Sequence, residues 1–332
     1  MKHWTEPNGI FLIHIPIEWQ YLNQAIEGES ETSPYSFQSY EDSLGCFQLS
    51  CYPLAELAPT VAEASPNGVK ELEWKQSRMD DSEFCAHIFY GALGDQALIG
   101  KFIYDIGLEN DKRITNELAK VSQILNSIVV VPSKDRKLAS DLDKFDRFTG
   151  ALAASHDLLH SAIESESYIE VIAICANLID AYLRLSIVIA KQLSDQTDSI
   201  ETKYLFQADH ERGIMERKIF NHALEAGVGD QELFDELDSL YQLRNRVIHR
   251  YIISNIKTRD LLKISSNYLT AVEKTRLILR DLEDKQATCE HGVYGRKFKR
   301  ADKTDNMAIQ RLLSEVNDKH LLDKFNRKFS AK

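Results

Sequence analysis

The sequence has little cysteine, and what it has forms no CxxC pair. Its five cysteines are an odd number, which suits a reduced compartment better than a framework of disulfides. The first residues also lack the pattern of a secretory signal peptide, because a Pro-Asn-Gly break precedes any apolar run. We therefore expect a cytoplasmic protein.

Basic charge is scarce in most of the chain. Acidic side chains outnumber basic ones by 51 to 40, which argues against wrapping by nucleic acid over the whole surface. Residues 1–132 carry a net charge of −11 and residues 133–284 one of −6, whereas residues 285–332 carry +6. The basic extension, residues 286–332, is expected to contain a short helix at 307–325. Two interpretations stay open for it: docking on the rest of the protein, or electrostatic guidance of RNA.

Proline is absent beyond residue 132, where the composition changes. All seven prolines and eight of the 14 glycines lie in residues 1–132. There, β-forming runs predict strands, with turns at Glu41–Gly45 and Gly91–Asp95, and two helical patterns interrupt them. The expected strands are 9–15, 35–52, 84–92 and 97–106, and the expected helices are 54–65 and 114–127. These patterns predict an acidic α+β sandwich, an antiparallel sheet with two helices, that could act as a sensor or regulatory domain.

After a polar stretch at 133–140, expected to be a linker, the sequence has helical periodicity. We predict helices at roughly 141–165, 167–193, 201–226, 230–256 and 258–285. Asp230 is the expected N-cap of the fourth of these helices. The region 141–285 is therefore expected to fold as an all-α, up-and-down helical bundle, which makes this a two-domain chain.

The most apolar segment, residues 168–190, is long enough to span a bilayer. It contains four polar or charged residues, and each charge near the membrane centre would cost about 2.5–3.5 kcal/mol. These residues are Glu170, Asn177, Asp180 and Arg184. We therefore expect the central helix of a soluble bundle and no membrane.

One charged residue interrupts the apolar stripe of the fourth predicted helix. Arg244 falls among Leu240, Val247 and Tyr251 on that stripe. Because an unpaired buried guanidinium is costly, Arg244 should either be paired or face a cleft. Asp180 could pair with Arg184 on its own helix, or it could satisfy Arg244 from the facing helix. We favour the second arrangement, because it solves the burial problem.

A histidine surrounded by cations occupies another stripe of the same helix. His249 lies next to Arg250 and three residues after Arg246, a setting that suits an anionic ligand. Arg244 and His249 are five residues apart, so they leave an ideal helix about 140° from each other. Either the arginine bends around the helix, or a second copy of the helix completes a composite site across a twofold axis.

The run from Arg244 to Tyr251 resembles the R-N-x3-H-x-Y signature of HEPN domains, especially the toxin partners of minimal nucleotidyltransferases. Residues 177–187 also resemble the acidic-then-arginine helix of that family. The resemblance covers about residues 140–285. It implies a helical bundle that dimerises, with arginine and histidine in a shared cleft, and many members are metal-independent endoribonucleases.

The resemblance also implies roles for individual residues. His249 would be the general acid/base, and Arg244 would bind the scissile phosphate or orient the cleft, with support from Asn245. Tyr251 matches a position that some toxin–antitoxin pairs modify, which would imply an antitoxin or other regulatory protein as partner. Asp180 and Arg184 would support the site, and Arg246 and Arg250 would bind RNA. The N-terminal region, with its FLIHIPIEW and IGKFIYDI runs and a closing helix that ends in ILNSIVVV, is loosely similar to Mog1/PsbP-like sandwiches.

The leading expectation is therefore a dimeric, toxin-like or antiphage endoribonuclease that needs no cofactor and no metal. One alternative is a non-catalytic dimerisation or ligand-binding module, and another is a scaffold whose acidic domain recruits a protein partner. Two weaker motifs are set aside. His156 and His160 lie one turn apart but have no obvious third ligand. The run at 91–101 places Asp95 where a Walker A motif needs glycine.

Overall fold

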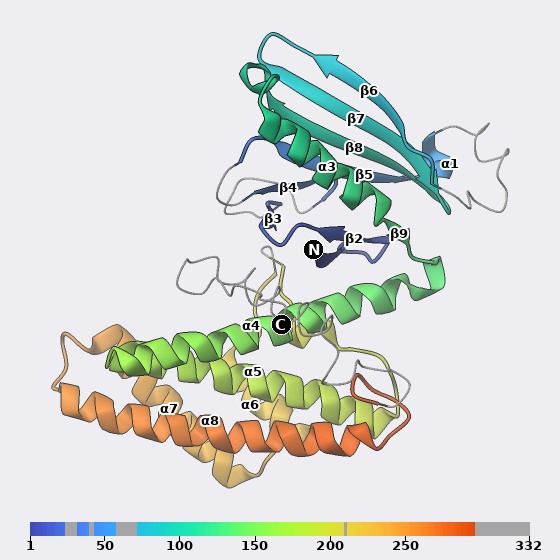
Figure 1. The fold of residues 1–332 in the computed structure, drawn as a ribbon. Coiled ribbons are helices and arrows are strands. Elements are labelled where there is room, and N and C mark those ends of the chain that lie inside the picture. The colour runs from blue at the N-terminus through green and yellow to red at the C-terminus, as the bar shows by residue number, and fades with distance from the viewer. Residues whose placement is uncertain (24–31, 40–42, 58–71, 209–210, 296–332) are drawn as a thin grey trace, which may run out of the picture. The chain divides into compact units, whose positions relative to one another are not determined.

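The chain divides into two compact units, residues 1–140 and 141–332 (Figure 1). The computed structural model describes residues 1–23, 32–39, 43–57, 72–208 and 211–295. The helix expected at 307–325, and with it most of the basic extension, lies outside the described residues. The fold class is confirmed: a unit with antiparallel sheets comes first, and a helical bundle follows.

The first unit contains two antiparallel sheets. The smaller has the order β1-β2-β9, and the larger has the order β3-β4-β5-β8-β7-β6. Their strands are β1 (Lys2–Thr5), β2 (Phe11–Ile15), β3 (Trp19–Tyr21), β4 (Tyr35–Ser39), β5 (Cys46–Pro53), β6 (Lys75–Asp80), β7 (Phe84–Leu93), β8 (Gln96–Asp105) and β9 (Val129–Val130). Every pairing joins antiparallel neighbours, so hairpins and short connections account for much of the topology.

Helix α3 (Lys112–Asn126) covers one face of the larger sheet, as Figure 1 shows. Its apolar side, which includes Val121, Ile124 and Leu125, is fully buried in the core of this unit. Gly100 of β8 makes the close approach possible, because a Cβ there would lie 3.0 Å from the side chain of Leu125. The sheet and this helix form the predicted sandwich.

Both predicted hairpins are confirmed. Phe37 of β4 lies opposite Phe47 of β5, and β7 and β8 pair down to Leu93 and Gln96 at their turn. The four strands that the sequence analysis missed, β1, β3, β6 and β9, are short or, in β6, wholly exposed. Of the helix expected at 54–65, the structure describes α1 (Leu54–Leu57), and the remainder lies among residues that are not described.

The second unit is a helical bundle. Its helices are α4 (Arg136–Glu164), which begins within the first unit, α5 (Tyr168–Asp195), α6 (Glu216–Glu225), α7 (Gln231–Arg250) and α8 (Thr258–Ala287). The linker expected at 133–140 is instead helical: a 3-10 turn, Ser133–Asp135, leads directly into α4. A polar sequence predicted a linker there, but polar residues also suit the exposed face of a helix.

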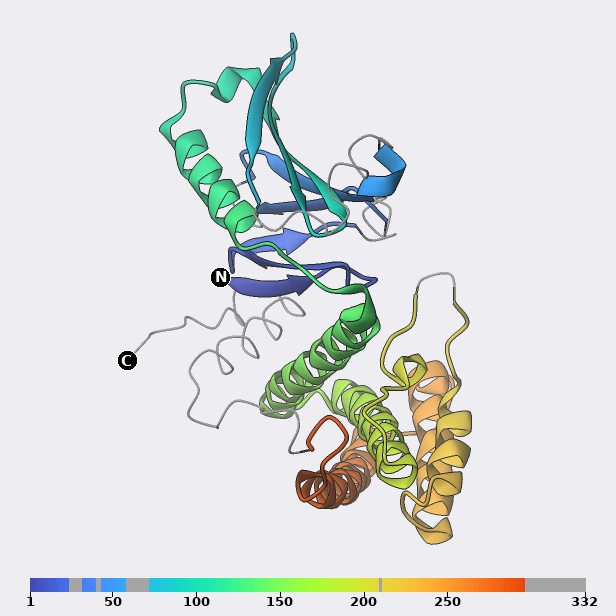
Figure 2. The ribbon, with the colours of Figure 1, turned by 90° about the vertical axis from the view of Figure 1, so that its right-hand side faces the viewer.

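Helix α5 is the core of the bundle. Long and apolar enough to cross a membrane, it nevertheless has 72% of its most hydrophobic window buried by the surrounding helices (Figure 2). It packs against α6, α7 and α8. This burial is what a central helix of a soluble bundle requires, as the sequence predicted.

The prediction of one continuous helix over 201–226 is wrong. Only Thr202–Tyr204, a 3-10 turn, and α6 are helical, and the described residues between them form a loop. Gly213 interrupts the helical pattern, and Arg184 of α5 provides alternative partners for two backbone carbonyls of this segment. The N-cap prediction for α7 is confirmed, because the Asp230 carboxylate accepts a hydrogen bond from the Leu233 amide at 2.9 Å.

Candidate functional site

Arg244 is half-buried, and it is paired. Its Nη1 donates to Glu216 Oε2 at 2.6 Å, and its Nη2 donates to Asn245 Oδ1 at 3.1 Å. The guanidinium also lies over the ring of Tyr241, 4.8 Å from the ring centroid. The sequence analysis correctly predicted that Arg244 needs a partner, but it did not find Glu216, which lies in the first turn of α6.

The prediction that Asp180 pairs with Arg244 is wrong. Asp180 forms its ion pair with Arg184 one turn along α5, with Nε and Oδ2 at 2.5 Å. The arrangement that was left as the alternative is therefore the one observed. Arg184 also donates to the backbone oxygens of Tyr204 at 3.3 Å and Ile214 at 3.1 Å, so it connects both of these residues to α5.

These two ion pairs are close enough to influence one another. Burial raises the pKa of Asp180, while the charges of Arg184 and Arg244 oppose that rise. Burial likewise raises the pKa of Glu216, with Arg244 and Arg184 opposing and the Asp180 charge reinforcing the rise. The four side chains thus form one alternating cluster of charges between α5, α6 and α7, which we call the charge cluster.

The C-terminal end of α7 is different in character. Arg246, His249 and Arg250 are exposed. His249 has no hydrogen bond or ion pair with any residue that the structure describes. Exposed isoleucines accompany it: Ile248, Ile252 and Ile253 are 42%, 95% and 83% exposed. We call these six residues the α7 end surface. Apolar side chains exposed together in this way are typical of a protein contact.

Arg244 and His249 do not share a face of α7. The helix is continuous from Gln231 to Arg250, so the two side chains leave it about 140° apart. Arg244 points toward α6, whereas His249 is exposed. Tyr251, just beyond the helix, is half-buried against the core of the bundle. A single chain therefore presents His249 with Arg246 and Arg250, and it keeps Arg244 for the charge cluster.

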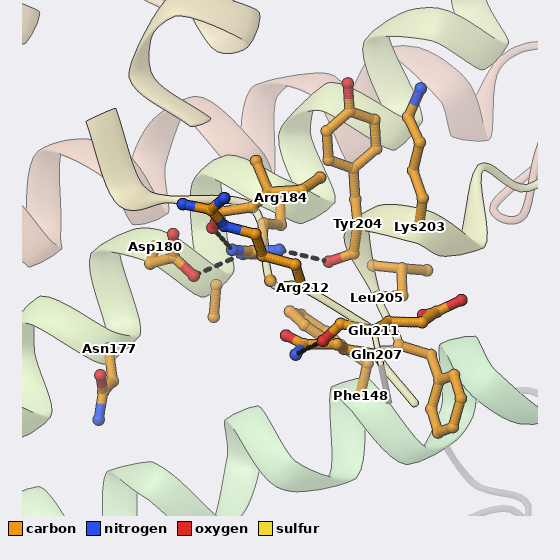
Figure 3. A pocket seen from close by; sticks show the side chains of 14 residues that line it. Phe148, Asn177, Asp180, Arg184, Lys203, Tyr204, Leu205, Gln207, Glu211 and Arg212 are labelled. Carbon is orange, nitrogen blue, oxygen red and sulfur yellow. Dashed lines mark hydrogen bonds and ion pairs between the residues drawn. The ribbon is translucent and has the colours of Figure 1, made fainter. Parts of the chain in front are cut away.

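A cavity of about 700 Å³ lies beside the charge cluster, and Asp180 and Arg184 of that cluster are among its lining residues (Figure 3). Residues 203–207 and 211–214 form one wall, and α4 and α5 contribute Phe148, Asn177, Asp180 and Arg184. The residues of this wall were not among the predicted site residues, because the helical pattern predicted a helix over 201–226. A signal was present in Gly213 and in the polar run that precedes it.

No metal site is apparent in the part of the chain that the structure describes, where no three His, Cys, Asp or Glu side chains gather suitably. The two histidines of α4 have separate partners. His156 Nε2 lies 2.7 Å from the Tyr182 hydroxyl, and burial lowers the pKa of this imidazole. His160 is exposed beside Glu164, at 3.1 Å.

No protein-family model and no curated protein matches this chain. Among solved structures, it is similar to a crystal structure from Bacteroides thetaiotaomicron, with 9% identity and a TM-score of 0.29, over 82% of this chain and 98% of that one. It is also similar to the solution structure of cyanobacterial PsbP (CyanoP) from Synechocystis, with 11% identity and a TM-score of 0.22, over 39% and 92%. Similarity at this level carries no functional argument.

Proposed function

We propose that the helical bundle is a HEPN-type, metal-independent endoribonuclease that acts as a homodimer in a toxin-like or antiphage role. The observation that carries the proposal is the α7 end surface. It combines an exposed imidazole, two exposed guanidiniums and a patch of exposed isoleucines. The cations would bind the RNA backbone, and the isoleucines would bury themselves against a second copy.

The chemistry needs only side chains that this surface provides. His249 would take the proton from a ribose 2′-hydroxyl, whose oxygen then attacks the adjacent phosphorus. The bond from phosphorus to the 5′-oxygen breaks, and that oxygen receives a proton from the second imidazole of the dimer. The products are a 2′,3′-cyclic phosphate and a 5′-hydroxyl, while Arg246 and Arg250 neutralise the phosphate charge.

Arg244 acts as a positioning residue in this proposal. Glu216 and Asn245 already accept hydrogen bonds from its two Nη atoms, and its guanidinium covers Tyr241. Its contribution is to fix the rotation of α7 against α6, and thereby the direction in which His249 projects. This corresponds to the second of the two roles that the family resemblance implies, orientation of the cleft.

The acidic first unit would restrain or trigger the nuclease, in a protein of the cytoplasm. Five free cysteines, of which two are buried, suit that compartment. An antitoxin or other regulatory protein could act on the same surface, although Tyr251 is half-buried and would need to move before modification.

One observation favours a second function, a dimerisation or ligand-binding module without catalysis. Both Nη atoms of Arg244 already have acceptors, as expected for a structural residue between two helices, and this arrangement does not require the phosphate-binding role that the family resemblance implies.

An assay of the full chain separates the two functions. The protein is incubated with mixed-sequence RNA in EDTA, and the ends of any fragments are analysed. The nuclease proposal predicts fragments with 2′,3′-cyclic phosphate ends. Binding of RNA without fragments, at any protein concentration, would support the module instead.

A further inference from the structure

The cavity beside the charge cluster is built by specific contacts. Arg184 fastens the backbone of the loop at Tyr204 and Ile214. Within the loop, Gln207 Nε2 donates to the Glu211 backbone oxygen at 2.7 Å, and the Glu211 carboxylate accepts from the Ala208 amide at 3.1 Å. Figure 3 shows the bonds of Arg184 and the bond from Gln207 to Glu211. These hydrogen bonds connect the described residues of the wall to one another and to α5.

Two polar groups at this cavity have unused hydrogen-bonding capacity. Arg212 is exposed and has no acceptor among the residues that the structure describes. Asp180 Oδ1 is buried and has no donor, because Arg184 binds the other carboxylate oxygen. A buried carboxylate oxygen without a donor is costly. Because Asp180 Oδ1 has no accessible surface, Arg212 is the one of these two groups that a ligand in the cavity can contact.

The rest of the lining combines apolar and aromatic side chains with polar and charged ones, among them Asn177, Gln207 and Glu211. Phe148, Leu205, Phe206 and Ile214 supply apolar surface, and Lys203 adds a second cation at the wall. Phe206 is 45% exposed, and its ring has the ammonium group of Lys144 5.5 Å from its centroid. A volume of about 700 Å³ falls in the range of small-molecule sites, which join an apolar lining to a few fixed polar groups.

We propose that this cavity binds a small organic anion with an aromatic body. Arg212 binds the anionic group, and Phe148 and Phe206 contact the aromatic body. The site does not depend on RNA cleavage, and it shares no residue with the α7 end surface. It does share Asp180 and Arg184 with the charge cluster, so the ligand would contact the groups adjacent to Glu216 and Arg244.

The probe 8-anilino-1-naphthalenesulfonate carries both features, aromatic rings and an anionic sulfonate. Its fluorescence is titrated with the folded full chain, beside the neutral probe N-phenyl-1-naphthylamine, which lacks the sulfonate. The proposal predicts saturable binding of the anionic probe at one site. Arg212→Gln should weaken that binding about tenfold, the equivalent of one charged hydrogen bond.

Two controls make the result specific. Arg280→Gln removes an exposed arginine of α8 and should leave the affinity unchanged. The neutral probe should bind more weakly, and Arg212→Gln should not alter its affinity. The proposal is overturned if the anionic probe does not bind, if Arg212→Gln leaves its affinity unchanged, or if the Arg280 control weakens it equally.

Discussion

The ion pair between Glu216 and Arg244 should stabilise the bundle far more than an exposed pair of the same length. Its side chains are only 17% and 21% exposed. Replacing Arg244 with methionine leaves the Glu216 carboxylate without its main compensating charge in a partly desolvated place. We expect this change to cost about 3 kcal/mol of unfolding free energy, because removing one member of a buried pair strands the other.

A double-mutant cycle isolates the pair from the other contacts of Arg244. The four proteins are the wild type, Glu216→Gln, Arg244→Met and the double variant, each unfolded in urea. Arg244→Met also removes the contact with Tyr241, but this loss is the same with and without Glu216→Gln, so it cancels in the coupling energy. The coupling energy should be about 1–2 kcal/mol.

The chain provides a matched control for this cycle. Lys274 and Glu236 also join α7 to a neighbouring helix with N and O atoms at 2.6 Å, but they are 50% and 34% exposed. The corresponding cycle with Lys274→Met and Glu236→Gln should give a much smaller coupling energy, because solvent screens this exposed pair. Equal couplings in the two cycles would refute the argument that burial makes the Arg244 pair structurally important.

Two further predictions concern association and pH. Ile252→Asp or Ile253→Asp should weaken dimer formation at least tenfold in sedimentation equilibrium, whereas Ile163→Asp on α4 should not change it. A dimer that neither Ile252→Asp nor Ile253→Asp weakens would reject the α7 end surface as the dimer contact. Burial raises the pKa of Asp180 and Glu216, so the protonated carboxyls favour the folded state: this contribution to stability is complete below about pH 4 and is lost as the pH rises through the raised values. The melting temperature of a variant with Asp180→Asn and Glu216→Gln should therefore fall less between pH 4 and 7 than that of the wild type. An equal fall in both proteins would contradict this.

Local sequence signals predicted the elements that local forces determine. The hairpin between β7 and β8 follows from two alternating runs around Gly94 and Asp95, and the start of α7 follows from the capping side chain of Asp230. Helix α5 was predictable because its apolar surface can be buried only inside a bundle. Each of these features depends on residues that are close in sequence.

Partners that come from distant segments were harder to predict. The need of Arg244 for a partner followed from its position on an apolar stripe. Whether Asp180 or Glu216 is the partner of Arg244 depends on where α6 begins, and no local sequence signal specified that residue. The loop that lines the cavity was missed for a related reason: its backbone is held by Arg184, about 20 and 30 residues away in the sequence.

The proposed nuclease is tested most directly by comparing two histidine variants. Rates of RNA cleavage in EDTA are measured for the wild type, His249→Ala and His160→Ala; His160 is also exposed and helical, but it lies on α4 beside Glu164. We predict that His249→Ala loses at least a hundredfold in rate, in keeping with general acid–base catalysis, while His160→Ala retains the wild-type rate. Equal cleavage by wild type and His249→Ala would contradict the assignment.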